Sequence, residues 1–236
     1  EELEAIRRDG EHKQKLPGVP IPSEITLTAD LEAAISGADL VIFGIPSSFL
    51  RATAKLAAPY LYAPMVIVNT GKGLEAGTHY TMSQILQEEL PHLPIVTITG
   101  PSHAEEVARN VPTTVVAASK DLQAAEYVQK TMSSETLRLY RNSDIIGCEV
   151  GGALKNIIAL SAGICDGLGC GDNTKAALMT RGMHEITKLG VAMGGQRETF
   201  AGLSGIGDLI VTCCSMHSRN RRAGILIGEG VSPEEA

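Results

Sequence analysis

The sequence predicts an α/β protein in which a twisted, mostly parallel sheet is followed by an all-helical region. Two observations along the 236 residues lead to this fold class. Up to about Asn142, short apolar runs rich in β-branched residues alternate with helical patterns, which is typical of β-α-β units. From Glu149 onward the strand signals stop, and glycine-rich turns, "DGLGCGDN" and "GLSGIGD", join helical segments. We therefore expect a sheet domain over residues 1–143 and a helical domain over residues 144–236.

Each expected strand is short and almost unbroken in apolar character, as "DLVIFGI" and "MVIVNT" illustrate. Strands that are buried on both faces of a sheet have this composition. The expected strands cover residues 39–45, 65–70, 95–99 and 113–119. Apolar residues at helical spacing predict helices over residues 49–56, 82–90, 104–109 and 122–132.

The composition excludes several classes of protein. A hydrophobic content of 44% is enough to build a core, and a formal net charge of -7 gives no electrostatic basis for binding nucleic acid. No apolar run approaches the roughly 20 residues of a membrane span, and no signal-like segment opens the chain. We therefore expect no integral membrane segment and a cytoplasmic location. The cysteines form no CxxC pair and the histidines have no metal-ligand spacing, which predicts reduced thiols and no metal site.

Turn-forming segments with small residues lie where ligands of a parallel sheet bind, beyond the carboxyl ends of the strands. These segments are "IPSS", "NTGKG" and "TGPSHAEE". Lys72 lies in the second, which is not a P-loop because Gly73 follows the lysine in place of Ser or Thr. In the third, Ser102 either caps a helix or faces a ligand, and the amides from Gly100 onward can face an anion. We expect His103 to begin the next helix.

Lys155 stands inside the apolar helical stretch "GGALKNIIALSAG". The apolar residues at helical spacing predict one apolar face: Leu154, Ile157, Ile158 and Ile164. Small residues one turn from Lys155 would let a ligand approach the ammonium, and partial burial would lower its pKa toward the range of proton exchange. In the alternative interpretation, the lysine stem covers the helix and its head reaches water.

A basic cluster follows in "GIGDLIVTCCSMHSRNRRAG". Asp208 precedes Thr212 by four residues, so both would share one helix face. Arg219 lies between Ser218 and Asn220, and the planar fork of arginine together with amides at a helix start suits a phosphate group. This segment therefore predicts a phosphate clamp, whereas the arginines at positions 221 and 222 are expected to form an exposed basic turn.

Together, these motifs resemble those of NAD(P)-dependent glycerol-3-phosphate dehydrogenases of the bacterial type. The resemblance rests on "GGALKNIIALSAGICDGLGCGDNTKAAL", "GLSGIGDLIVTCCSMHSRNRRAG", "NTGKGLE" and "TGPSHAEE", in this order and spacing over nearly the whole chain. Ser218 directly before "RN" resembles the bacterial pattern, because glycine usually stands there in the eukaryotic one. The resemblance implies a Rossmann-like domain followed by a helical substrate-binding domain. It also implies NAD or NADP as cofactor, a homodimer, and reversible reduction of dihydroxyacetone phosphate to sn-glycerol 3-phosphate, which supplies the glycerol backbone for phospholipid synthesis.

A role for each matching residue follows from the resemblance. Lys155 would exchange a proton with the C2 oxygen of the substrate, and Lys72 and Asp208 would be the other catalytic residues. The implied substrate-binding residues are Lys72, Gly100, Ser102, Lys155, Asn156, Asp208, Thr212, Ser218, Arg219 and Asn220. The implied cofactor-binding residues are Phe49, Lys72, Ala104 and Arg219. No metal is implied, and His103 stands where an aromatic or another residue is frequent, which leaves its role open.

Relative to this family, we expect the chain to be a partial sequence at both ends. No GxGxxG motif follows the first recognisable strand, so the first β-α-β unit, with the pyrophosphate loop and the strand that separates NADH from NADPH, would precede the chain. Ser232 and Glu235 have the spacing of a capping box with Pro233 between them, which predicts a further helix. Several helices of the family would follow Ala236.

Two other functions fit the residues less well. One is another lysine-using, two-domain dehydrogenase that acts on a phosphorylated sugar acid or a β-hydroxy acid, although "SRNRR" disfavours substrates without phosphate. The other is a catalytically silent protein that senses a dinucleotide on the same fold. Lys72, Lys155 and Asp208 argue against a silent protein, because sensing needs none of the three.

Overall fold

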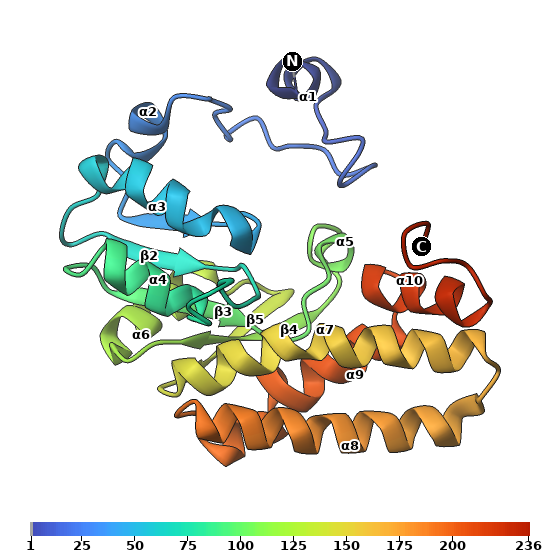
Figure 1. Cartoon of the computed structure of the whole chain (residues 1–236). Helices are drawn as coiled ribbons and strands as arrows, with labels where there is room; N and C mark the ends of the chain where they lie inside the picture. Colours follow the sequence, from blue (N-terminus) through green and yellow to red (C-terminus); the bar gives the residue numbers. More distant parts are fainter. Residues whose placement is uncertain (1) are drawn as a thin grey trace.

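Five strands form one sheet in the order in which they follow along the chain, in a computed structural model that describes residues 2–236 (Figure 1). The strands are β1 (Leu40–Phe43), β2 (Val66–Asn69), β3 (Ile95–Thr99), β4 (Thr113–Ala118) and β5 (Leu137–Asn142). Neighbouring strands pair in parallel except β3 and β4, which are antiparallel. The predicted mostly parallel sheet is therefore confirmed, and the four predicted strands are present.

The edge strand β5 is missing from the prediction. Leu139 is buried, whereas the neighbouring Arg138 and Tyr140 are exposed. An edge strand with one solvated face alternates between apolar and polar residues, so it lacks the continuous apolar run expected of a strand covered on both faces. The alternation in "LRLYR" was the available signal.

Helices cover both faces of the sheet. They are α2 (Leu31–Ile35), α3 (Leu50–Ala57), α4 (Met82–Glu89) and α6 (Leu122–Met132), whereas α1 (Glu2–Asp9) precedes them and the short α5 (Ala104–Val107) follows β3 without burying a residue. Ile67 of β2 belongs to the apolar cluster under α3 and α4, whereas its neighbour Val68 belongs to the cluster under α6. Successive side chains of a strand point to opposite faces, so this division places β2 between two layers of helices. Local caps fix where the helices begin: Asp121 accepts from the first amides of α6, and Thr81 and Gln84 form a capping box for α4.

The helical part is built around α7 (Ile145–Gly167) and α8 (Gly171–Ala192), which lie side by side in Figure 1. A π-helical turn at Leu203–Gly207 leads into α9 (Asp208–Cys214), and α10 (Arg219–Gly228) packs on α7. The predicted apolar face of α7 is only partly correct: Leu154 and Ile158 pack against the core, whereas Ile157 is 62% exposed. The buried face consists instead mainly of small residues, and Gly163 and Gly224 let the backbones of α7 and α10 approach each other closely.

Within residues 2–236, α7 is the one helix long and apolar enough to cross a membrane, judged by length and composition. Of its most apolar window, 56% is buried inside the protein, and α8, α9 and α10 pack around it. The helix also carries Glu149 and Lys155, both buried. These features are those of a core helix.

Glu149 connects α7 to the sheet domain through hydrogen bonds. Its carboxylate is 4% exposed and accepts hydrogen bonds from the amide of Ser83 (2.9 Å), from the Ser83 hydroxyl (2.5 Å) and from the Thr97 hydroxyl (2.9 Å). Burial raises the pKa of Glu149, because the hydrogen bonds compensate only part of the lost hydration. Glu149 is missing from the predicted residues, although a carboxylate inside the apolar run "IIGCEVGGAL" was a usable signal.

Truncating this carboxylate is expected to destabilise the fold. Glu149→Ala leaves the donors of Ser83 and Thr97 buried without acceptors, so the free energy of unfolding should fall by about 3 kcal/mol. Glu149→Gln keeps the shape and an acceptor oxygen and should lose less. Urea unfolding monitored by circular dichroism measures both changes. Glu135→Ala, at an exposed glutamate, is the control, and an equal effect of the two alanine variants would contradict this role for Glu149.

Candidate active site

The carboxyl ends of β1, β2 and β3 lie at one edge of the sheet because these strands run in parallel. The buried Asn69 shapes the turn after β2: its side-chain amide donates to the carbonyl of Gly71 (2.9 Å) and its side-chain oxygen accepts from the Gly71 amide (3.0 Å). This turn carries Lys72. Gly73 has φ +154°, and a Cβ there would lie 2.9 Å from the Ser47 hydroxyl, so only glycine lets the turns after β1 and β2 approach this closely.

Two lysines and one aspartate from distant parts of the chain meet at this edge. Lys155 on α7 donates to Oδ1 of Asp208, the first residue of α9. Lys72 donates to Oδ2 of the same carboxylate (2.7 Å) and to the carbonyl of Gly100 after β3 (3.0 Å). Lys155 is 6% exposed and Asp208 is 1% exposed. The interpretation in which the head of Lys155 reaches water is therefore wrong.

Burial is the largest influence on the titration of Lys155. Together with the Lys72 ammonium, it lowers the pKa of Lys155 from 10.5 to about 8, although Asp208 acts in the opposite direction. Two ammonium groups around one carboxylate leave a local excess of positive charge in a chain whose formal net charge is -7. The arrangement therefore suits an anionic ligand and a group that exchanges a proton near neutral pH.

The surrounding residues hold this cluster in place. Thr212 lies one turn after Asp208 and donates its hydroxyl to the Asp208 carbonyl (2.6 Å), so the predicted shared helix face is confirmed. A Cβ on Gly151 would lie 2.5 Å from the carbonyl of Ser204, so a glycine is needed where α7 passes the π-helical turn before Asp208. Asn156, next to Lys155, is partly exposed and its side chain makes no hydrogen bond within residues 2–236.

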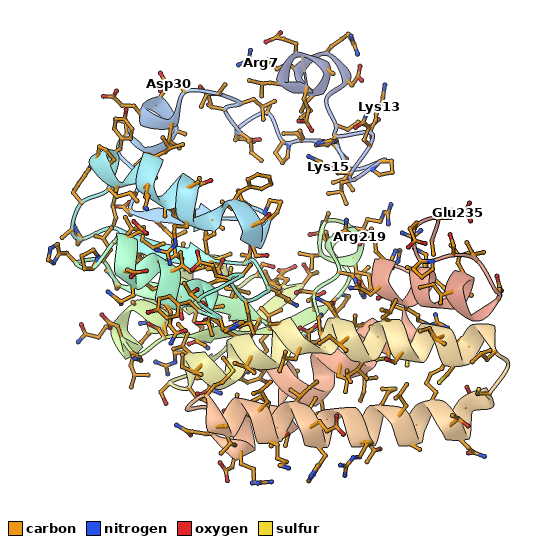
Figure 2. The ribbon with its side chains drawn as sticks, in the orientation of Figure 1. Arg7, Lys13, Lys15, Asp30, Arg219 and Glu235 are labelled. Atoms are coloured by element: carbon orange, nitrogen blue, oxygen red, sulfur yellow. The ribbon has the colours of Figure 1, made fainter. Side chains whose placement is uncertain are left out.

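The predicted phosphate clamp lies at the start of α10. Ser218 caps the helix, since its hydroxyl accepts from the Arg221 amide (3.2 Å). Arg219 and Asn220 are exposed, and the Arg219 guanidinium has no ion pair with a residue in the described part of the chain. Figure 2 shows Arg219 at the end of α10 that faces α5. Arg219 and Asn220 are thus free to meet a ligand, whereas Ser218 is buried and its hydroxyl is engaged in the cap.

Arg221 corrects the prediction of an exposed basic turn. Its guanidinium binds Asp166 of α7 with Nε–Oδ2 and Nη2–Oδ2 distances of 2.9 and 2.8 Å, and it also donates to the carbonyl of Cys214 (3.0 Å). Lys175 of α8 binds the other oxygen of Asp166 at 2.6 Å. Arg221 therefore joins three helices, whereas Arg222 is exposed as predicted. Asp166 is missing from the predicted residues because its partners lie on other helices.

The turn after β3 approaches the start of α10. The Ser102 hydroxyl donates to the carbonyl of Gly100 (3.0 Å), so Ser102 is not the helix cap. His103 occupies the cap position of α5, as expected, and its ring lies 5.7 Å from that of His217, which directly precedes Ser218. Burial and, after it, the Lys155 ammonium lower the pKa of His103. Both the lysine cluster and the predicted clamp therefore border this turn.

Two further predicted residues lie near these loops. Phe49 ends a short 3-10 helix after β1 and is 62% exposed, and Ala104 is the exposed first residue of α5. In residues 2–236, no group of three or more His, Cys, Asp or Glu side chains could hold a metal ion. Nε2 of His103 is the one buried side-chain nitrogen or oxygen in this range without a hydrogen-bond partner.

Comparison with protein families gives two matches along the chain. Residues 1–125 match the model of the NAD-dependent glycerol-3-phosphate dehydrogenase N-terminus, and residues 144–236 match that of its C-terminus. A glycerol-3-phosphate dehydrogenase (NAD(P)+) of Moorella thermoacetica is 60% identical over 98% of this chain and 69% of its own length. The corresponding protein of Desulfitobacterium hafniense is 54% identical over 99% of this chain and 66% of its own length. The chain thus spans about two thirds of the length of these relatives.

Solved structures give the same result. The crystal structure of glycerol-3-phosphate dehydrogenase from Coxiella burnetii superposes with a TM-score of 0.95 at 37% identity, covering 99% of this chain and 72% of that one. The structure of the Dunaliella salina enzyme superposes with a TM-score of 0.90 at 27% identity, covering 99% of this chain and 42% of that one. A ketopantoate reductase from Ralstonia eutropha, at 13% identity and a TM-score of 0.53, shares the fold alone.

Proposed function

The chain belongs to the family of NAD-dependent glycerol-3-phosphate dehydrogenases, and we propose that the protein is an oxidoreductase that reduces dihydroxyacetone phosphate reversibly to sn-glycerol 3-phosphate with NADH or NADPH. The observation that carries this proposal is the buried cluster of Lys155, Asp208 and Lys72 at the carboxyl edge of the sheet. A spectrophotometric assay of the full-length protein, following NADH and NADPH consumption with dihydroxyacetone phosphate, tests it. The product would supply the glycerol backbone of phospholipids.

The fit of a nicotinamide to this chain rests on the loops beyond β1 and β3. Phe49 is 62% exposed in the segment after β1, and the small side chain of Ala104 is exposed beyond β3. Ligands of a parallel sheet bind beyond the carboxyl ends of its strands, where an exposed aromatic ring and a small residue suit contact with a flat ring. We assign Phe49, Lys72, Ala104 and Arg219 to cofactor binding. When bound there, the nicotinamide supplies or accepts the hydride.

Lys155 performs the proton transfer in this proposal. Reduction of a ketone generates negative charge on the C2 oxygen, and the Lys155 ammonium donates a proton to that oxygen. Lys72 stabilises the same charge, since its ammonium is held beside the cluster by Asp208 and by the Gly100 carbonyl. Asp208 orients both ammonium groups. In the reverse direction the neutral amine of Lys155 accepts the proton of the substrate hydroxyl.

The remaining assigned residues position the substrate. Ser218, Arg219 and Asn220 bind the phosphate at the start of α10, where backbone amides and an unpaired guanidinium are present. We assign Gly100, Ser102 and Asn156 to contacts with the rest of the triose, and Thr212 to support of Asp208. Contacts with the phosphate at one end of the substrate and with the triose at the other would hold C2 next to Lys155.

The pH dependence of the two directions should be opposite. Because the pKa of Lys155 is about 8, the ammonium needed for reduction is present below about pH 8 and is lost above it. Thus kcat/KM for dihydroxyacetone phosphate should fall about tenfold per pH unit above pH 8, and kcat/KM for glycerol 3-phosphate should rise up to about pH 8 and then level. Initial rates between pH 6 and pH 10 measure both profiles. A limb that stays near the ordinary lysine pKa of 10.5 would contradict the lowered pKa of Lys155.

The domain boundary, the oligomeric state and the cellular location complete the proposal. We propose that the chain divides between the sheet and helical domains near residue 143, just before α7 begins at Ile145. We also propose a homodimer, which rests on the family resemblance, and a cytoplasmic location, as expected from the sequence. Light scattering of the purified protein tests the oligomeric state, and fractionation of cells tests the location.

A further inference from the structure

The C-terminus of α7 brings two cysteines together through its backbone geometry. Gly169 has φ +71°, its amide donates to the Asp166 carbonyl (3.0 Å), and the amide of Cys170 donates to the Cys165 carbonyl (3.0 Å). These two hydrogen bonds and the left-handed glycine define a Schellman motif, whose longer hydrogen bond places the first and sixth residues next to each other. Here those two residues are Cys165 and Cys170.

The two thiols differ in accessibility. Cys170 is exposed and Cys165 is partly buried. Burial raises the pKa of the Cys165 thiol, and the adjoining Cys170 thiol raises it further. An exposed thiol reacts first with a reagent in solution, and a less accessible thiol beside it then resolves the product.

We propose that Cys165 and Cys170 form a redox modification site, a dithiol that a low-molecular-weight disulfide converts to an intramolecular disulfide. In the first step, the Cys170 thiolate attacks a sulfur of glutathione disulfide, which forms a Cys170–glutathione bond and releases one glutathione thiolate. In the second, the Cys165 thiolate attacks the Cys170 sulfur and releases the second glutathione thiolate. The two cysteines lose two electrons and two protons in total, and one glutathione disulfide is reduced to two glutathione molecules.

The disulfide would link the two ends of the turn at the C-terminus of α7, and Asp166 lies within this turn. The Asp166 carboxylate pairs with Lys175 on α8 and with Arg221 on α10, so the turn lies at the junction of three helices. Its position at the far end of α7 from Glu149 keeps it away from the contacts with the sheet. The site is independent of the dehydrogenase proposal, since none of its groups is assigned to substrate or cofactor.

Peptide mapping after oxidation tests the proposal on the full chain. The protein is incubated with mixtures of glutathione and glutathione disulfide, alkylated, and digested with trypsin. Cleavage after Lys155 and Lys175 places both cysteines in one peptide, residues 156–175, whereas Cys213 and Cys214 fall together in residues 198–219. We expect peptide 156–175 to lose two hydrogens and both alkylation sites, and to regain the sites after dithiothreitol, while peptide 198–219 stays alkylated.

Single substitutions test the order of the two steps. Cys165→Ser should retain one glutathione on Cys170, because the resolving thiol is absent. Cys170→Ser should leave Cys165 reduced, and Cys214→Ser is the matched control that should oxidise like the wild type. Peptide 156–175 with two alkyl groups under every condition, stable glutathione on the wild-type peptide, or equal oxidation of both peptides would each overturn the proposal.

Discussion

Replacing Lys155 with alanine should lower kcat for dihydroxyacetone phosphate by about 10²- to 10⁴-fold, the usual effect of losing a positioned acid or base. The ammonium of Lys155 is buried on the carboxylate of Asp208, so alanine removes the acid placed there and leaves Lys72, which is paired with the other oxygen, as the remaining ammonium. KM should change less, because Lys72 and the phosphate clamp still bind the substrate. Steady-state rates with NADH at saturating substrate measure the loss.

Two variants separate chemistry from folding in this experiment. Lys155→Met fills the space of the lysine stem without its ammonium and should lose as much activity as the alanine variant. Lys175→Ala removes a lysine whose side chain is also largely buried and ion-paired, but whose partner is Asp166 rather than Asp208. It should keep kcat within a few fold of the wild type. Turnover of Lys155→Ala within a few fold of the wild type would show that another group supplies the proton.

The inner strands of the sheet are well predicted from the sequence, because the signal of a buried strand lies in the strand's own residues. Strands covered on both faces are rich in β-branched apolar residues, and β2 and β3 are nearly fully buried and consist mostly of valine, isoleucine and threonine. Helix α6 begins and ends as predicted, since Asp121 caps it directly before an amphipathic pattern. The edge strand β5 has one solvated face and therefore lacks this signal.

The helical part is harder to predict, because its close packing depends on small residues from distant segments. A pattern of large apolar residues suggests that Ile157 faces the core, yet α7 buries its glycines and alanines so that α10 and the π-helical turn can approach. The same packing buries Lys155, which the pattern alone left between two interpretations. Ion pairs between distant residues are also hard to predict from the sequence. Arg221 is an example, because its partner Asp166 lies 55 residues earlier in the chain.

The assembly of the candidate site is likewise a tertiary property. Lys72 and Asp208 are separated by 136 residues and still share a hydrogen bond. Their meeting follows from the parallel order of β2 and β3 and from the packing of α9 on α7, neither of which a motif contains. Turn chemistry at a strand end identified Lys72, and helical patterns identified Lys155 and Asp208, whereas the family resemblance related the three to one another.

Replacing Arg219 with lysine should lower kcat/KM for dihydroxyacetone phosphate by about ten- to a hundredfold. Lysine keeps one positive charge but loses the planar fork, so two parallel hydrogen bonds to the phosphate cannot both form. A hydrogen bond to a charged group contributes roughly 1.5 to 3 kcal/mol, which corresponds to this range. The guanidinium of Arg219 is exposed and without an ion pair in residues 2–236, so the substitution breaks no such contact in the free protein.

The control for Arg219→Lys is a substrate without the phosphate. Dihydroxyacetone should be a poor substrate of the wild type, and the substitution should change its kcat/KM little, because the lost contact is never made. Arg222→Lys, at an exposed arginine on the same helix, should leave both substrates unaffected. If Arg219→Lys instead lowered kcat/KM equally for both substrates, Arg219 would act through the cofactor or the fold. The assignment of the phosphate to the start of α10 would then have to be withdrawn.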